Sequence, residues 1–170
     1  MEKIYLGDAG PKVSPVIYGF YRWDQEENTP ASMERIVRLC LELGINTFDH
    51  ADIYGDYKCE ELFGNLIANK SVKREEIILF TKCGLRIPHK SQQGLRFTHV
   101  DTSKEHILRS IDNSLKKLRT DYIDIFLLNG FDPIANLEET AATLRQLKEK
   151  GKIKEYLLVI ILGFGSLYSK

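Results

Sequence analysis

One segment in the first third of the chain organises the rest: Asn46-Thr47-Phe48-Asp49-His50-Ala51-Asp52-Ile53-Tyr54-Gly55. Its first four residues read as a short buried strand that ends in a carboxylate, and a polar loop carrying a tyrosine follows. A second apolar stretch, residues 77–80, runs directly into Thr81 and Lys82. If both strands belong to one parallel sheet, their carboxyl ends bring Asp49, Tyr54 and Lys82 together.

The segments around these two strands alternate between helix and strand patterns. Thr29 and Pro30 match the N-cap and the first position of a helix that ends near Gly44. Further helices are expected at residues 59–67, whose inner face begins at Cys59, after the capping sequence at residues 102–105 and after Asn136. Further strands are expected at residues 16–20, 122–128 and 155–162, with a small hairpin within residues 3–14 and a long polar loop at residues 84–100.

This alternation predicts a parallel sheet with helical crossovers. Two architectures satisfy it, a doubly wound open sheet and a (β/α) barrel. The first strand is not followed by a G-x-G-x-x-G sequence, which counts against a dinucleotide-binding doubly wound fold. Polar residues at the carboxyl ends of strands favour the barrel, because active sites lie on that face of barrels.

The composition is that of one globular domain. The chain has 170 residues, of which 43% are hydrophobic and 28% charged, and its formal net charge is zero. No basic surface for nucleic acid and no apolar run of about 18 residues for a membrane is evident. Cys40, Cys59 and Cys83 show no metal-binding spacing and are expected to be reduced thiols. We therefore expect a cytoplasmic protein without nucleic-acid or membrane partners and without a metal.

Asp49, Tyr54 and Lys82 are chemically suited to handle a proton. A free tyrosine has a pKa near 10, and a nearby ammonium lowers that pKa by favouring the phenolate. A carboxylate beside the lysine would hold the ammonium in place, so that the three side chains form a proton donor for a carbonyl oxygen. Each residue alone has a common structural explanation, namely a capping Asp, a half-exposed Tyr or a strand-end Lys, and only the combination indicates a site. His50 points to the other side of the strand and is interpreted as a structural histidine.

Several motifs, in order, resemble the aldo-keto reductase family. Residues 48–55 are similar to the family signature, which Glu60, Glu61, Phe63 and Gly64 continue. Residues 80–84 and residues 120–124, followed by Leu127 and Leu128, are also similar to the family. The resemblance runs from about residue 4 to residue 156.

The resemblance implies an eight-stranded (β/α) barrel that reduces aldehydes and ketones with NADPH, or less often with NADH. Asp49, Tyr54 and Lys82 would occupy three places of the catalytic tetrad. Tyr54 would protonate the carbonyl oxygen of a small substrate as hydride arrives from the nicotinamide. The cofactor-binding residues would be Gly19, Phe20 and Tyr21, in a loop that continues to Arg22, together with Asp49.

The sequence departs from the family pattern at Asn129. The family's fourth strand normally ends in His, whereas this chain reads Asn129-Gly130-Phe131-Asp132-Pro133. An amide can donate a hydrogen bond to a substrate oxygen but cannot relay a proton. We therefore expect weak turnover.

A second departure lies at the carboxyl-terminal end. Residues 1–156 read as the first part of a barrel, about five of its eight strands, and residues 157–170 as an aberrant apolar tail. Codons for Leu158-Val159-Ile160, read one base out, can spell the Val-Ser-Asn that the family has there, so we hypothesise a shifted reading frame. Most of the cofactor site would then be missing, and the chain alone is expected to have little or no activity. The alternatives are a non-catalytic half-barrel that assembles as a homodimer through its open sheet edges, and a degraded gene product.

Overall fold

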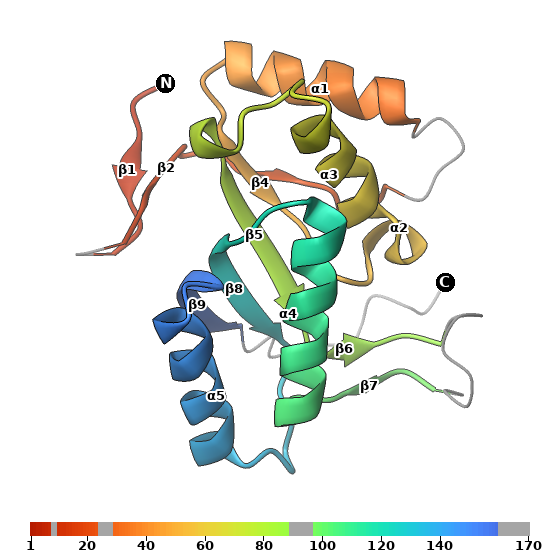
Figure 1. Ribbon diagram of the computed structural model, residues 1–170, viewed down its shortest axis with the longest axis vertical. Coiled ribbons are helices and arrows are strands. Elements are labelled where there is room, and N and C mark those ends of the chain that lie inside the picture. The colour runs from red at the N-terminus through yellow and green to blue at the C-terminus, as the bar shows by residue number, and fades with distance from the viewer. Residues whose placement is uncertain (8–9, 24–28, 89–96, 160–170) are drawn as a thin grey trace, which may run out of the picture.

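The computed structural model describes residues 1–7, 10–23, 29–88 and 97–159. Its centre is a five-stranded parallel sheet (Figure 1). In spatial order the strands are β3 (Tyr18–Gly19), β4 (Thr47–Asp49), β5 (Ile78–Cys83), β8 (Ile123–Asn129) and β9 (Ile153–Val159).

The helices connect successive strands of the sheet. They are α1 (Pro30–Glu42), α2 (Tyr54–Tyr57), α3 (Cys59–Ala68), α4 (Lys104–Leu118) and α5 (Leu137–Glu149), with a short 3-10 turn, η1 (Arg74–Glu76). Within the part of the chain that the structure describes, no helix is long and apolar enough to cross a membrane.

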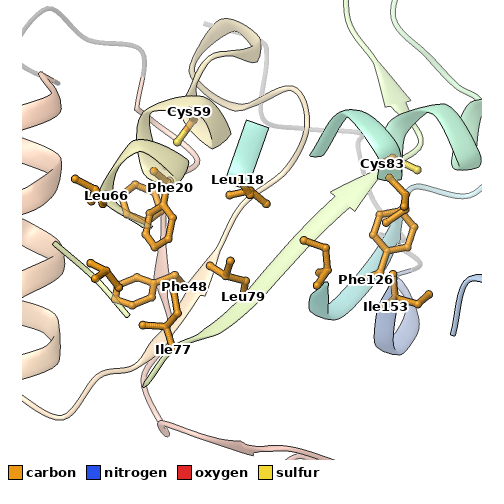
Figure 2. Packing of buried hydrophobic residues seen from close by; sticks show 14 of the residues in the cluster. Phe20, Phe48, Cys59, Leu66, Ile77, Leu79, Cys83, Leu118, Phe126 and Ile153 are labelled. Atoms are coloured by element: carbon orange, nitrogen blue, oxygen red, sulfur yellow. The ribbon is translucent and has the colours of Figure 1, made fainter. Parts of the chain in front are cut away.

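Side chains of alternating strand residues enter two separate hydrophobic clusters. Phe48, Leu79 and Phe126 pack with residues of α1, α3, α4 and α5 in the larger cluster, part of which is drawn in Figure 2. Phe80 and Ile125 point the other way and join a smaller cluster with Val13. Because the long helices all cover one face, the sheet has the layering of a (β/α) barrel rather than of a doubly wound sheet.

The amino-terminal segment forms a small hairpin that packs against the inner face of the sheet. It consists of β1 (Ile4–Tyr5) and β2 (Lys12–Val13), paired antiparallel. Val13 is buried and Leu6 packs against the same inner cluster. The hairpin therefore occurs where the sequence predicted one.

Two of the predicted helix starts are confirmed and one is wrong by a residue. Thr29 caps α1 and exchanges hydrogen bonds with Ser32, and Asn136 caps α5 by accepting from the Glu139 N–H. The cap of α4 is Ser103, which accepts from the His106 N–H. Thr102 does not cap the helix because its N–H and its hydroxyl both donate to Asp132 Oδ2, at 3.1 and 3.0 Å.

The predicted loop at residues 84–100 contains structure of its own. β6 (Leu85–Arg86) and β7 (His99–Val100) pair antiparallel beyond the end of β5 (Figure 1). Residues 89–96 of the predicted loop, and residues 160–162 of the predicted last strand, lie outside the described residues. The strand predicted at residues 16–20 is limited to two residues, and the last strand begins at Ile153 rather than at Glu155.

The three cysteine residues are free thiols buried in different elements. Cys40 lies in α1, Cys59 opens α3 and Cys83 ends β5. Each has at most 5% of its surface exposed.

Candidate active site

The carboxyl ends of β4 and β5 deliver the first two residues of the candidate site. These strands are neighbours, with Asp49 in register with Phe80, and Lys82 lies two residues further along β5. Since side chains alternate along a strand, Lys82 shares the inner face of the sheet with Phe80. Tyr54 is the first residue of α2, which follows β4 after a short loop.

The Lys82 ammonium group lies at the centre of the predicted residues. Its Nζ donates to Asp49 Oδ1 at 2.5 Å, to the His50 carbonyl oxygen at 2.7 Å and to Tyr54 Oη at 3.2 Å. The same Nζ lies 4.9 Å from the centre of the Tyr54 ring. The structure thus brings Asp49, Tyr54 and Lys82 into direct contact, although they are up to 33 positions apart in the sequence.

Burial controls the electrostatics of this group. Burial first, and then the Asp49 carboxylate, raise the pKa of the Tyr54 phenol. Burial also raises the pKa of Asp49 and lowers that of Lys82, in each case against the opposing effect of their ion pair. The sequence predicted a lowered tyrosine pKa from the nearby ammonium, whereas the net shift is upward. Consequently the phenol keeps its proton at neutral pH and is present as a proton donor.

The chain directly after Tyr54 has an unusual backbone. Gly55, Asp56 and Tyr57 are three consecutive residues with φ between 55° and 66°, a region that non-glycine residues rarely enter. A Cβ at Gly55 would lie 2.7 Å from the Trp23 carbonyl oxygen, so the turn packs tightly against the loop after β3. Such local strain is retained where the surrounding structure enforces it, and it is frequent at functional sites.

Tyr57 connects this turn to the β6 strand. Its Oη donates to the Ile87 carbonyl oxygen at 2.8 Å and accepts from the Ile87 N–H at 3.2 Å. Sequence reasoning missed this contact because a tyrosine three residues after Tyr54 shows no pattern of its own.

The residues predicted to bind a cofactor are in two different environments. Gly19 ends β3 in register with Asp49, and a Cβ at Gly19 would have only Asp49 Oδ2 within 4 Å, at 3.8 Å. Tyr21 is 57% exposed, and its ring meets the Tyr54 ring edge-on at 5.4 Å. Gly19 therefore leaves the Asp49 carboxylate uncrowded on its side, and Tyr21 contacts the site through the Tyr54 ring.

The Phe20 side chain differs from the prediction. It is 1% exposed and belongs to the helix-side core, because alternation turns it away from the face that carries Asp49. Its N–H donates to the Asp49 carbonyl oxygen at 3.0 Å. Phe20 thus supports the strand end through its main chain and its packing.

Asn129 is the last residue of β8 and lies at the same end of the sheet. Asn129 lies two residues after Leu127, which is the register partner of Lys82. Because side chains alternate along a strand, the Asn129 side chain points to the same face of the sheet as Leu127 and Lys82. A Cβ at Gly84 would lie 2.9 Å from the Asn129 carbonyl oxygen, which shows how closely the ends of β5 and β8 approach. The amide is therefore placed at the rim of the site, beside the strand that carries Lys82.

His50 has the structural environment that the sequence indicated. Its ring stacks on Phe20 at 4.7 Å and meets Phe63 at 4.6 Å, and its Nδ1 lies 3.7 Å from Cys59 Sγ. Burial lowers the pKa of His50 to about 3, so the ring is neutral. Among the residues that the structure describes, no group of three or more His, Cys, Asp or Glu side chains is placed to hold a metal ion.

Similarity to known proteins extends over most of the chain. Residues 15–158 match the model of the aldo/keto reductase family. An uncharacterised oxidoreductase of Bacillus subtilis, YcsN, is 41% identical over 156 residues, which are 92% of this chain and 52% of that protein. A 6-dehydroglucose reductase of Agrobacterium fabrum is 36% identical over 155 residues, covering 91% of this chain and 52% of that protein.

A solved structure gives the same result. The holo form of the aldo-keto reductase AKR11C1 from Bacillus halodurans superposes with a TM-score of 0.79 and 33% sequence identity, over 95% of this chain and 51% of that one. The chain thus spans about half the length of the relatives that it matches.

Proposed function

The chain belongs to the aldo/keto reductase family, and from this membership we propose that Asp49, Tyr54 and Lys82 form the proton-donating part of a site that reduces an aldehyde or ketone to an alcohol. The observation that carries the proposal is the Lys82 ammonium, which lies within hydrogen-bond distance of both Asp49 and Tyr54. The cofactor of this proposal is a nicotinamide in its reduced form, with NADPH preferred over NADH.

Each residue has a distinct role in the proposed reaction. Tyr54 Oη donates its proton to the carbonyl oxygen, while the carbonyl carbon accepts a hydride, so that the C=O group becomes CH–OH. Lys82 stabilises the phenolate that Tyr54 becomes, because a fixed positive charge in a water-poor site lowers the energy of a developing anion. Asp49 holds the ammonium in position, and the Asn129 amide can donate a hydrogen bond to the substrate oxygen.

The described residues fit the nicotinamide end of such a cofactor. A Cβ at Gly19 would have only Asp49 Oδ2 within 4 Å, and the Tyr21 side chain two residues further on is 57% exposed. Gly19, Tyr21 and the Asp49 carboxylate would hold the group there. When bound, the reduced nicotinamide supplies the hydride.

The test is carbonyl reduction by the purified chain with NADPH and a simple aromatic aldehyde, compared with the variant Tyr54→Phe. We expect little or no turnover from this chain, because Asn129 cannot relay a proton. Any turnover should fall roughly 100-fold or more in Tyr54→Phe, because general acid catalysis contributes about that much. Tyr122→Phe is the matched control, since Tyr122 directly precedes the amino end of β8 and contacts Arg74. Turnover that persists in Tyr54→Phe would contradict the assignment.

Cofactor binding is measured separately by thermal unfolding with and without NADPH. A ligand at about 100 times its dissociation constant adds about 2.7 kcal/mol to the stability of the folded state. We expect the unfolding temperature of both the parent chain and Tyr54→Phe to rise with NADPH, and to rise less with NADH. A transition that neither cofactor moves would count against a nicotinamide site in this chain.

A further inference from the structure

A second polar cluster lies behind Lys82, on the helix side of β5, and the proposed reaction does not use it. Thr81, the residue before Lys82, is fully buried and its hydroxyl donates to Glu60 Oε1 at 2.7 Å. Glu60 comes from α3 and is 1% exposed. The carboxyl group therefore anchors the strand one residue before the candidate catalytic lysine.

Asp52, in the loop after β4, holds the next residue of β5, Lys82. Its N–H donates to the Lys82 carbonyl oxygen at 3.0 Å. Its carboxyl group accepts from the Ser110 hydroxyl of α4 at 2.9 Å. The Asp52 main chain and the Glu60 side chain together fix the two consecutive residues Thr81 and Lys82.

The charges of this region do not balance when all groups are ionised. Three carboxyl groups, Asp49, Asp52 and Glu60, face two ammonium groups, Lys82 and Lys117. Lys82 is paired with Asp49, and Lys117 donates to the Tyr57 carbonyl oxygen at 2.9 Å. One negative charge in excess remains, and an uncompensated buried charge is strongly unfavourable, so a bound proton is the simplest compensation.

Two buried polar atoms lie at the free side of the Glu60 carboxyl group. Glu60 Oε2 and Ser114 Oγ are both buried and have no hydrogen-bond partner within distance. Ser114, on α4, nevertheless acts on the Glu60 carboxyl group, so the two side chains face each other. The Ser114 hydroxyl can donate to an ionised Glu60 or accept from a protonated one. The excess negative charge favours the protonated form, in which Glu60 Oε2 donates to Ser114 Oγ after a small rotation of either side chain.

We propose that Glu60 is a positioning residue for Lys82, and that it acts as a neutral carboxylic acid which accepts a hydrogen bond from Thr81 and donates one to Ser114. Burial raises the pKa of Glu60, and burial is also the main cause that raises the pKa of Asp52 to about 7. Lys117 of α4 acts on both carboxyl groups by lowering their pKa. Glu60 in turn raises the pKa of Cys59 of α3, and both carboxyl groups raise that of Cys83 of β5. The inference rests on the proposed function only in that Lys82 is the residue being positioned.

The first test detects the proton itself. A buried neutral carboxyl group has an infrared carbonyl band separate from that of a carboxylate, and we expect this band in the parent chain at pH values of about 8, where Asp52, with its pKa of about 7, is ionised. Glu60→Gln should remove it, whereas the exposed neighbour variant Glu61→Gln should leave it unchanged. If the band persists in Glu60→Gln and disappears in Asp52→Asn, the proton resides on Asp52 and the assignment is overturned.

The second test measures the position of Lys82 through its reactivity. The rate at which an anhydride acylates Lys82, followed by mass spectrometry across pH, depends on the neutral amine fraction and on access. Glu60→Gln keeps both hydrogen bonds and should match the parent profile. Glu60→Leu loses both, and we expect the rate at a fixed pH to change roughly tenfold, as for a shift of one pKa unit.

Two outcomes of this second test would overturn the positioning role. One is a folded Glu60→Leu variant with the parent profile, and the other is a Glu60→Gln variant whose profile is displaced. If Glu60→Leu does not fold, the Glu60→Gln profile alone decides. Neither the infrared band nor the acylation profile depends on a cofactor or on turnover. Tyr54→Phe can therefore abolish carbonyl reduction and leave both readouts unchanged, so this inference and the proposed function are tested separately.

Discussion

The ion pair of Lys82 and Asp49 is mostly withdrawn from solvent, with 13% and 23% of the two side chains exposed. Lys82→Met would leave the Asp49 carboxylate without its ammonium partner. We expect a loss of about 3 kcal/mol in the free energy of unfolding, because removing one partner of a buried pair leaves the other charge buried without compensation. Urea unfolding at neutral pH measures it.

The matched control is the exposed pair of Lys148 and Glu155, whose side chains are 46% and 41% exposed. Lys148→Met should cost less than about 1 kcal/mol. The double variant Asp49→Asn with Lys82→Met should regain much of the loss, since no unpaired charge remains. If Lys82→Met costs no more than Lys148→Met, the pair is not a buried one in solution.

The raised pKa of Asp52 predicts that the stability of the folded chain depends on pH. Burial is the main cause that raises this pKa to about 7 in the folded chain, compared with 3.8 for an ordinary aspartate. Between these values the folded state keeps a proton that the unfolded state has released, so the contribution of Asp52 to stability falls as pH rises from about 4 to about 7 and is level above that. Asp52→Asn should flatten this part of the curve and raise stability at pH values of about 8. An unchanged slope in the variant, measured by thermal unfolding across pH, would exclude Asp52 as the source.

At the scale of elements, the contact between α3 and α4 depends on Gly64. A Cβ at this position would lie 2.0 Å from the Lys117 carbonyl oxygen, which belongs to the rigid backbone of α4. Gly64→Ala must therefore push the two helices apart, and we expect a destabilisation of about 3 kcal/mol, at the upper end of the range for overpacking. Asn65→Ala, one residue further on the exposed side of α3, should change stability by less than about 0.5 kcal/mol in the same denaturation experiment. Equal effects of the two substitutions would show that the helices adjust freely.

The elements that could be predicted from the sequence are those with local signals. Apolar runs identified β4, β5 and β8, and capping residues identified the starts of α1 and α5, because these patterns act over a few residues. The cap of α4 was misassigned because Asp132, 30 positions away, binds the Thr102 hydroxyl. Strand ends indicated the Asp49, Tyr54 and Lys82 group, whereas the contact of Glu60 with Thr81 depends on how α3 packs on β5, which no local pattern encodes.

At the scale of the whole molecule, the sheet has two edges. In the part of the chain that the structure describes, β3 and β9 each have a hydrogen-bonded neighbour on one side only. Leu157 on β9, and Val16 and Ile17 just before β3, are more than 40% exposed. Exposed apolar edge strands are templates for pairing with another chain. We therefore propose that this chain self-associates through β3 and β9.

Light scattering over a range of concentrations tests this proposal. We expect a dimer or a larger species at micromolar concentrations, and a shift toward monomer in Leu157→Lys, because an edge charge opposes strand pairing. Lys70→Met, an exposed change at the end of α3, should leave the association unchanged. A monodisperse monomer at the highest concentration would refute the proposal.

The buried cysteines of α1, α3 and β5 can each report the local unfolding of the element that contains them. Burial raises the pKa of Cys40, raises that of Cys59 to about 12 and raises that of Cys83 well above its usual value, so none of the three is reactive while its surroundings stay closed. A disulfide reagent therefore modifies each thiol only when its own element opens, and the order of modification gives the order in which the molecule comes apart. Cys83, next to Lys82 on a central strand, should react last, and its rate would then set the lifetime of the intact site.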